Sequence, residues 1–249
     1  MTRAVTADAR RLDQALVERG LVETRQKAQA LIRAGHVRLD GELAEKADQR
    51  VTDRSALEVK AQSRFVGRGG EKLDGALDDL GVDVIGRVCL DAGASTGGFT
   101  DALLQRGARL VYAVDVGYGQ LAWKLRQDER VVVLERTNIR DLQSLPGPLP
   151  DLAVGDLSFI SLRQVVPSIR GLLAPHGELV MMLKPQFEVG RGRVGKGGVV
   201  RDQADRDEAV RAFGEWAAST GLTVLATAAA RITGAKGNQE YFLHMRADG

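Results

Sequence analysis

Residues 87–107 read RVCLDAGASTGGFTDALLQRG, and this stretch decides the fold of the larger part of the chain. An apolar run ends at Asp91, a glycine-containing loop follows, and apolar residues at helical spacing continue to Gly107. Strand, glycine loop and helix in this order form the first half of a βαβ unit. The glycines let a ligand lie against the backbone, and the helix N-terminus favours polar groups. Ser95 stands where the fingerprint G-x-G-x-x-G has its second glycine, which disfavours a nicotinamide cofactor.

Outward from this stretch, apolar runs alternate with helical segments at the spacing of βαβ units in a parallel sheet. The predicted strands are Arg87–Asp91, Leu110–Asp115, Val131–Glu135, Leu152–Asp156, Glu178–Lys184, Val224–Ala230 and Glu240–Arg246. Only residues 232–239 separate the last two, too few for a helical crossover, so the last strand is expected to be antiparallel. We predict an α/β, Rossmann-like, seven-stranded domain over residues 64–249, with ligands at the carboxyl edge of the sheet.

The first 63 residues have a different pattern and are predicted to form a small, separate α+β domain. Apolar residues from Leu12 have helical spacing that stops at Gly20. Thr24 is placed to cap a second, amphipathic helix. The pair Asp40-Gly41 then predicts a tight turn after a short strand. The domain boundary therefore lies between residues 63 and 64.

Composition restricts the class of protein. The chain has 249 residues, 44% hydrophobic and 27% charged, with a net charge of +2, as expected for globular material. No apolar run approaches the roughly 20 residues of a membrane helix, and no secretory signal is visible at the start. The single cysteine, Cys89, excludes an internal disulfide framework, and three scattered histidines give no zinc-like spacing. We expect a reducing, cytoplasmic setting, no membrane contact and no metal.

The string RLDQALVERGLVETRQKAQALIRAGHVRLDG, residues 11–41, resembles the alpha-L RNA-binding motif. In that family, basic residues around the second helix contact the RNA backbone, which implies an interface at Arg25, Lys27, Arg33 and Arg38. Phosphate contacts of this kind supply affinity and position more than sequence choice. The alternative interpretation is that these residues form the solvated face of a helix.

The loop DAGASTGGF, residues 91–99, resembles the first motif of S-adenosylmethionine-dependent methyltransferases. The resemblance implies that Asp91, Gly93 and Ser95 hold the methionine portion of S-adenosyl-L-methionine. Asp115 ends the second strand, where such enzymes place an acid that accepts hydrogen bonds from ribose hydroxyls; a turn aspartate is the alternative. Asn138 follows the third strand, where these folds contact adenine, and an ordinary loop asparagine is nearly as good an interpretation.

Four further polar residues are predicted to lie at or near the carboxyl edge. Asp156 and Lys184 end strands, Glu240 begins the antiparallel strand, and Lys72 lies near the start of a helix, where a cation opposes the helix dipole. Their order resembles the Lys-Asp-Lys-Glu set of ribose 2′-O-methyltransferases of the FtsJ/RrmJ type. The resemblance implies Lys184 as the base or the group that orients the hydroxyl, Lys72 as its assistant and the two carboxylates as positioning groups. A surface ion-pair network is the alternative.

Several motifs together resemble the TlyA/hemolysin A family. Besides the alpha-L string, they are FVGRGGEKLDGAL (65–77), DAGASTGGFT (91–100), GDLSFISL (155–162), LKPQFEVGR (183–191) and GNQEYF (237–242). This resemblance implies 2′-O-methylation of cytidine in ribosomal RNA of the large subunit, and in some members also of the small subunit. Ribosomal RNA or ribosomal subunits are then the partners. Two other classes stay open: a non-catalytic ribosome-binding or assembly factor and, less favoured without a membrane-active segment, a pore-forming haemolysin.

Overall fold

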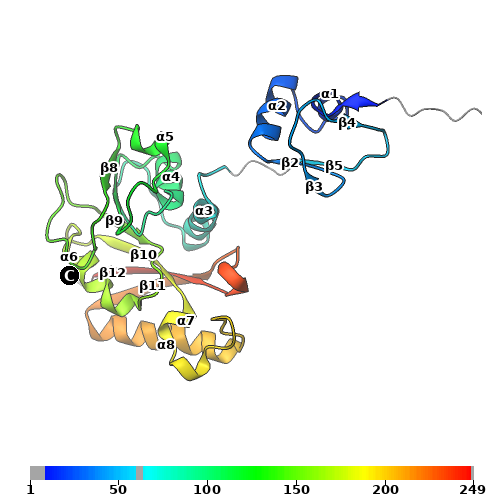
Figure 1. Cartoon of the computed structure of the whole chain (residues 1–249). Helices are drawn as coiled ribbons and strands as arrows, with labels where there is room; N and C mark the ends of the chain where they lie inside the picture. Colours follow the sequence, from blue (N-terminus) through cyan, green and yellow to red (C-terminus); the bar gives the residue numbers. More distant parts are fainter. Residues whose placement is uncertain (1–8, 60–63, 248–249) are drawn as a thin grey trace, which may run out of the picture. The chain divides into compact units, whose positions relative to one another are not determined.

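The computed structural model describes residues 9–59 and 64–247 of the chain (Figure 1). The chain divides into two compact units, residues 1–63 and 64–249. Each unit has a hydrophobic core of its own. No helix in the described ranges combines the length and apolar character needed to cross a membrane.

The N-terminal unit packs two helices on short strands. Thr24 caps the second helix, its hydroxyl accepting from the backbone N–H of Lys27 at 3.2 Å, as the sequence predicts. Asp40 and Gly41 both have positive φ, 51° and 86°, and close the predicted tight turn. The elements are β1 (Arg10–Arg11), α1 (Leu12–Glu18), α2 (Arg25–Arg33), β2 (Val37–Leu39), β3 (Glu42–Leu43), β4 (Arg50–Val51) and β5 (Leu57–Val59).

The larger unit is built on a seven-stranded sheet of order β11-β12-β10-β9-β6-β7-β8. Its strands are β6 (Val88–Ala92), β7 (Leu110–Val114), β8 (Val131–Leu134), β9 (Leu152–Gly155), β10 (Glu178–Leu183), β11 (Leu222–Ala229) and β12 (Tyr241–Ala247). Strand β12 pairs antiparallel with both β10 and β11, whereas the ladders from β10 to β8 are parallel. The predicted Rossmann-like sheet with an antiparallel last strand is confirmed.

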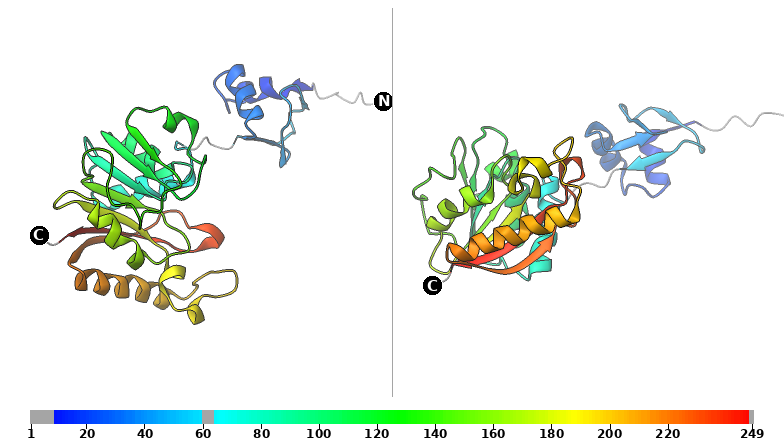
Figure 2. Two further views of the ribbon diagram at one scale, coloured as in Figure 1. Left: turned by 60° about the vertical axis from the view of Figure 1, so that its left-hand side comes forward. Right: turned by 90° about the horizontal axis from the view of Figure 1, so that it is seen from below.

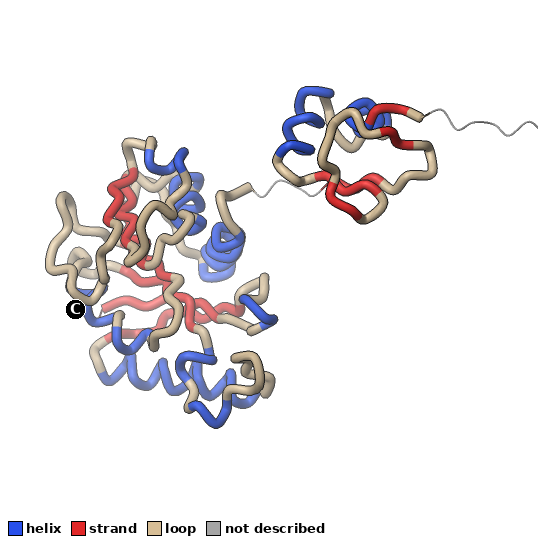
Figure 3. The backbone as a smooth tube through the Cα atoms, in the orientation of Figure 1, coloured by secondary structure: helices blue, strands red, loops and turns tan. Residues whose placement is uncertain are grey.

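Helices cover both faces of this sheet, as Figures 2 and 3 show. Apolar residues of α3 (Arg68–Leu80), α4 (Gly98–Gln105) and α5 (Trp123–Arg126) share one core cluster with the sheet. Those of α6 (Val166–Gly171) and α8 (Gln203–Ser219) share a second cluster on the other face. The short helix α7 (Pro185–Glu188) follows β10 directly. Three-residue 3-10 turns complete the unit: η1 (Leu162–Gln164), η2 (Arg191–Arg193) and η3 (Ala235–Gly237).

The sheet order brings distant polar residues to one edge. Asp115, Asp156 and Lys184 each follow the carboxyl end of a parallel strand, β7, β9 and β10. Because β12 runs in the opposite direction, Glu240, which precedes it, lies at that same edge. The positions of Asp156, Lys184 and Glu240 therefore follow from strand direction, as expected for the ligand-binding edge of an open α/β sheet. Lys72 lies on α3 and contacts Glu240.

Candidate active site

A cavity of about 500 Å³ opens at the carboxyl edge beside the glycine loop. Four of the five residues predicted to hold a cofactor line this cavity: Gly93, Ser95, Asp115 and Asn138. Its wall also includes Val116, Gln120, Thr137, Ile139, Arg140, Asp156, Leu157, Ser158 and Phe159. The cavity is thus lined by the loops that follow β6, β7, β8 and β9.

Gly93 cannot be replaced at this position without strain. Its φ is +86°, and a Cβ there would lie 2.9 Å from the backbone oxygen of Asp156. Asp115 then ties neighbouring loops together, because its carboxylate accepts from the N–H of Ser95 at 2.8 Å and of Gly117 at 2.7 Å. Each carboxylate oxygen keeps a further lone pair with which it can accept from a ligand hydroxyl.

Asp91, the fifth predicted cofactor residue, lies beneath the loop and does not line the cavity. Its side chain is fully buried, and Oδ2 accepts from the hydroxyl of Thr100 at 2.6 Å. Oδ1 has no hydrogen-bond partner among the described residues. Burial raises the pKa of Asp91 to about 7, against the lowering effect of the Thr100 hydrogen bonds. In this structure Asp91 therefore supports the start of α4 from below.

The predicted four-residue set forms two ion pairs. Lys72 Nζ lies 2.5 Å from Glu240 Oε2, and Lys184 Nζ lies 2.6 Å from Asp156 Oδ1. Lys72 and Lys184 are each 8% exposed and Glu240 is 3% exposed, whereas Asp156 is partly open. Buried lysines require a paired carboxylate. The alternative of a surface ion-pair network does not fit this degree of burial.

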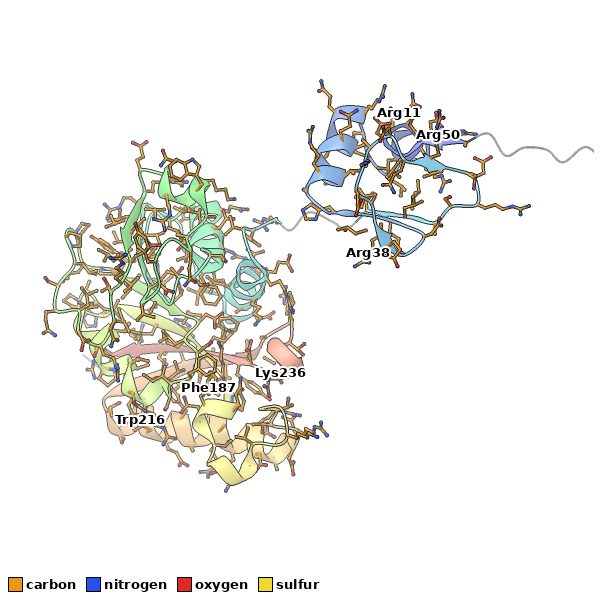
Figure 4. All side chains as sticks on the ribbon, in the orientation of Figure 1. Arg11, Arg38, Arg50, Phe187, Trp216 and Lys236 are labelled. Atoms are coloured by element: carbon orange, nitrogen blue, oxygen red, sulfur yellow. The ribbon has the colours of Figure 1, made fainter. Side chains whose placement is uncertain are left out.

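A second cavity, of about 390 Å³, is lined by three of the four residues that form these ion pairs. Lys72, Lys184 and Glu240 line it, together with Ser158, Phe159, Gln186, Phe187, Val194, Gly197, Gly198, Lys236 and Asn238. Ser158 and Phe159 line both this cavity and the one beside the glycine loop. Figure 4 labels Phe187 and Lys236, which mark the second cavity on the ribbon. The lysine amines thus face a space that adjoins the first cavity.

The basic residues predicted to bind RNA are all exposed on the N-terminal unit. Arg25 Nε donates to Asp13 Oδ2 at 2.8 Å, Lys27 pairs with Glu23, and Arg38 donates to the carbonyl of Gly41. Arg33, in the last turn of α2, completes the predicted group. Figure 4 labels Arg38 on this unit.

Asp13 organises the arginines of the N-terminal unit from inside. Its carboxylate is buried and accepts from Arg11, Arg25 and Gln29. Burial alone would raise the pKa of Asp13, but the hydrogen bonds from these partners outweigh it and hold that pKa well below its usual range. The guanidinium of Arg25 is therefore held in a fixed place at the surface.

Comparison with known families decides the relationship. Residues 65–247 match the FtsJ-like methyltransferase family, and residues 10–55 match the S4 domain. The Mycobacterium tuberculosis protein named 16S/23S rRNA (cytidine-2'-O)-methyltransferase TlyA is 51% identical over 240 residues, 95% of this chain and 89% of that protein. The chain belongs to the TlyA/hemolysin A family of FtsJ-like methyltransferases.

Other members of the TlyA/hemolysin A family are similar to this chain over nearly its whole length. Hemolysin A of Brachyspira hyodysenteriae is 40% identical, covering 94% of this chain and 98% of its own. A solved structure of a hemolysin-named protein from Streptococcus thermophilus has a TM-score of 0.75 and 39% identity, over 96% of this chain and 89% of the other. The S4 domain is the module predicted here as the alpha-L motif.

A more distant likeness shows the fold alone. The 1,6-didemethyltoxoflavin-N1-methyltransferase of Burkholderia thailandensis, solved with S-adenosylhomocysteine, matches with a TM-score of 0.51 and 20% identity over 73% of this chain and 78% of its own. The two proteins therefore share the fold of the sheet.

Sequence reasoning missed three residues of this TlyA-family site. Ser158 Oγ lies 2.9 Å from Lys184 Nζ and accepts a hydrogen bond from it. Phe159 is 91% exposed with a φ of +64°, and its ring lies 5.5 Å from that of Phe187. Both belong to the string GDLSFISL, whose polar and aromatic residues directly after a strand were the available signal.

Glu188 is the third missed residue. It is buried in α7 and accepts from the hydroxyl of Ser161 and the N–H of Leu162, both at 2.7 Å. Burial raises the pKa of Glu188, partly offset by these hydrogen bonds. The segment that carries Asp156 and Ser158 is thereby fixed to the helix that follows Lys184.

The glycine-rich segment 190–198 is held by Asn238. This buried side chain donates to the carbonyl of Gly198 at 2.8 Å and accepts from the N–H of Val200 at 3.1 Å. Gly197 and Gly198 line the second cavity, and Asn238 lies two residues before Glu240 in the sequence. Val194 of the same segment also lines this cavity, so the segment contributes to its wall.

Proposed function

We propose that this protein methylates the ribose 2′-hydroxyl of cytidine in ribosomal RNA of the large subunit, with the small subunit as a second target, using S-adenosyl-L-methionine. The observation that carries the proposal is the pair of buried Lys–carboxylate contacts, Lys72 with Glu240 and Lys184 with Asp156, facing a cavity that adjoins the glycine loop. The Mycobacterium tuberculosis relative bears this activity in its name.

The first cavity fits S-adenosyl-L-methionine in size and in chemistry. Its volume of about 500 Å³ is in the range of small-ligand sites. Gly93 allows close approach to the backbone. We assign Ser95 to the methionine portion, Asp115 to the ribose hydroxyls and Asn138 to adenine, because all three line this cavity. Asp91 supports this loop from below. When bound, the cofactor supplies an electrophilic methyl group on a positively charged sulfur.

The second cavity supplies what a ribose hydroxyl needs before it can act as a nucleophile. Lys184 lies where the two cavities adjoin and, as a neutral amine, takes up or holds the hydroxyl proton. Lys72 lies beside the same cavity and stabilises the negative charge that develops on the oxygen. Asp156 and Glu240 hold the two amines in place.

The S4 domain supplies affinity for the RNA substrate. Arg25, Lys27, Arg33 and Arg38 are exposed cations, suited to phosphate oxygens of the RNA backbone. Such contacts bring the substrate to the protein and fix its register, while the catalytic domain selects the nucleotide.

The proposal is tested with isotope-labelled S-adenosyl-L-methionine and purified, unmodified ribosomal subunits, followed by mass spectrometry of the digested nucleosides. Label is expected in 2′-O-methylcytidine, and Lys184→Ala is expected to lower the rate by about 10²-fold to 10⁴-fold, the contribution typical of a general base. Label on a nucleobase would contradict the four-residue chemistry. RNA binding without transfer to either subunit would favour a non-catalytic ribosome-binding factor.

A further inference from the structure

Ser158 holds a place that none of the four charged residues shares. It lines both the cavity beside the glycine loop and the cavity that meets the lysine amines. Its hydroxyl accepts a hydrogen bond from Lys184 Nζ at 2.9 Å, across 26 residues of sequence. The contact therefore lies where the two cavities adjoin.

The contact with Asp156 does not by itself orient the amine of Lys184. Its Oδ1 lies 2.6 Å from Nζ, yet within the described part of the chain this oxygen accepts no hydrogen bond of acceptable angle. Coulomb attraction depends on distance and hardly on the direction of the N–H bonds, whereas a hydrogen bond weakens steeply as its angle closes. The directional partner of Lys184 is therefore Ser158.

Orientation matters because an amine accepts a proton only along its lone pair. The nitrogen is tetrahedral, so an N–H held by Ser158 fixes rotation about the Cε–Nζ bond. The carboxylate of Asp156 attracts a second N–H. The remaining position of the neutral amine is its lone pair, which is left to accept the proton of the ribose 2′-hydroxyl. Proton transfer is then aligned before the substrate arrives.

We propose that Ser158 is a positioning residue for the transfer, whose hydroxyl aims the lone pair of Lys184 at the ribose 2′-hydroxyl. This inference rests on the proposed function. In the transfer, the 2′-hydroxyl oxygen forms a bond to the methyl carbon, the carbon–sulfur bond breaks with its electrons staying on sulfur, and the hydroxyl proton passes to Lys184.

The segment that carries Ser158 is rigid enough for this task. Glu188 fixes Ser161 and Leu162 three and four residues later, and the positive φ of Phe159 is a conformation that bulky residues adopt only when their surroundings impose it. Ser158 itself is exposed and lines both cavities, so we expect a threonine to be accommodated there.

Three variants separate orientation from simple loosening of the segment. Ser158→Ala removes the hydroxyl, Ser158→Thr keeps it, and Ser161→Ala removes a hydroxyl from the same segment that contacts Glu188 and not Lys184. We expect Ser158→Ala to lower kcat on the order of tenfold, the value of one hydrogen bond to a charged group, with little change in KM. Ser158→Thr is expected to retain most of the wild-type kcat.

The pH dependence of kcat distinguishes loss of orientation from loosening of the segment, because loosening alone would not shift it. An acceptor beside an ammonium stabilises its charged form, so removing it shifts the acidic limb of kcat to lower pH, by about one unit in Ser158→Ala. The limb is expected to stay in place in Ser158→Thr and in Ser161→Ala. A Ser158→Ala profile that coincides with the wild type, or a Ser161→Ala profile shifted as far, would overturn the proposal.

A second readout needs neither cofactor nor RNA. Trace acetylation of the free protein with acetic anhydride, followed by digestion after glutamate and mass spectrometry, reports the reactivity of Lys184 as a function of pH. The midpoint is expected to move to lower pH in Ser158→Ala alone, and an unchanged midpoint would contradict the role of Ser158. Absence of methyl transfer by the wild type, with the midpoint shift present, would instead contradict the proposed function.

Discussion

At the scale of single residues, Asp13 and Asp91 show how surroundings decide the behaviour of a buried carboxyl. Asp13 is surrounded by two arginines and a glutamine amide, which favour its charged form. Asp91 has a single hydroxyl donor, Thr100, and an oxygen without a partner among the described residues. Burial therefore dominates at Asp91 and not at Asp13.

The raised pKa of Asp91, about 7, predicts a specific pH dependence of stability. In the unfolded chain this carboxyl ionises near its usual pKa of about 4. Between about pH 4 and pH 7 the folded state binds a proton that the unfolded state does not, so the contribution of Asp91 to stability falls as pH rises, by at most about 1.4 kcal/mol per unit. Above pH 7 this penalty is complete.

Asp91→Asn removes the titration while keeping the size of the side chain. We expect the stability of the variant relative to wild type to improve steadily from pH 5 to pH 7. Urea unfolding followed by tryptophan fluorescence measures this in the catalytic domain, because Trp123 and Trp216 are the only tryptophans of the chain. Stability curves that run parallel over this range would show that Asp91 is charged throughout.

At the scale of elements, the loop between β6 and α4 depends on the absence of a side chain at Gly93. Gly93→Ala is expected to cost about 1 kcal/mol of conformational free energy because φ is positive at this position. Its Cβ would also clash with the backbone of Asp156. Gly86→Ala is the matched control, because Gly86 has a φ of +71° and nothing within 4 Å of its Cβ position. We expect Gly93→Ala to weaken S-adenosyl-L-methionine binding on the order of tenfold, with Gly86→Ala unchanged, in isothermal titration calorimetry. Equal affinities would place the cofactor elsewhere.

The elements themselves were predictable because their signals are local. Each predicted strand of the catalytic domain is present, with its ends shifted by no more than two residues. Apolar runs, Gly107 and the short link 232–239 carried that information. The cap at Thr24 and the turn at Asp40-Gly41 were likewise predictable, since both depend on neighbours within four residues.

At the scale of the whole molecule, the division into an S4 domain and a catalytic domain predicts that RNA affinity and cofactor affinity respond to different substitutions. Lys27→Gln with Arg33→Gln removes two exposed cations from α2. The slope of log K for RNA binding against log salt is expected to fall by roughly 0.7 to 0.9 per lost phosphate contact. Fluorescence anisotropy across a salt series measures this slope.

Two controls accompany that substitution. Affinity for S-adenosyl-L-methionine, measured by calorimetry, is expected to stay at the wild-type value. Arg211→Gln removes a cation from α8 of the catalytic domain, where Arg211 pairs with Glu208 and Glu215, and is expected to leave the RNA slope unchanged. A slope that responds to Arg211 and not to α2 would move the RNA interface off the S4 domain.

The sequence by itself determined the strand–glycine loop–helix unit and the two-domain division, because both depend on local pattern. It also predicted the four polar residues of the candidate site, three of them from strand direction. Only the tertiary structure decided that Lys72 pairs with Glu240, that Ser158 accepts from Lys184, and that Asp91 lies beneath the cavity. The first two contacts join residues 168 and 26 positions apart. The first depends on β12 lying antiparallel beside β10, which brings Glu240 to the carboxyl edge, and the second depends on β9 pairing with β10. Side-chain depth and strand order are properties of the assembled sheet.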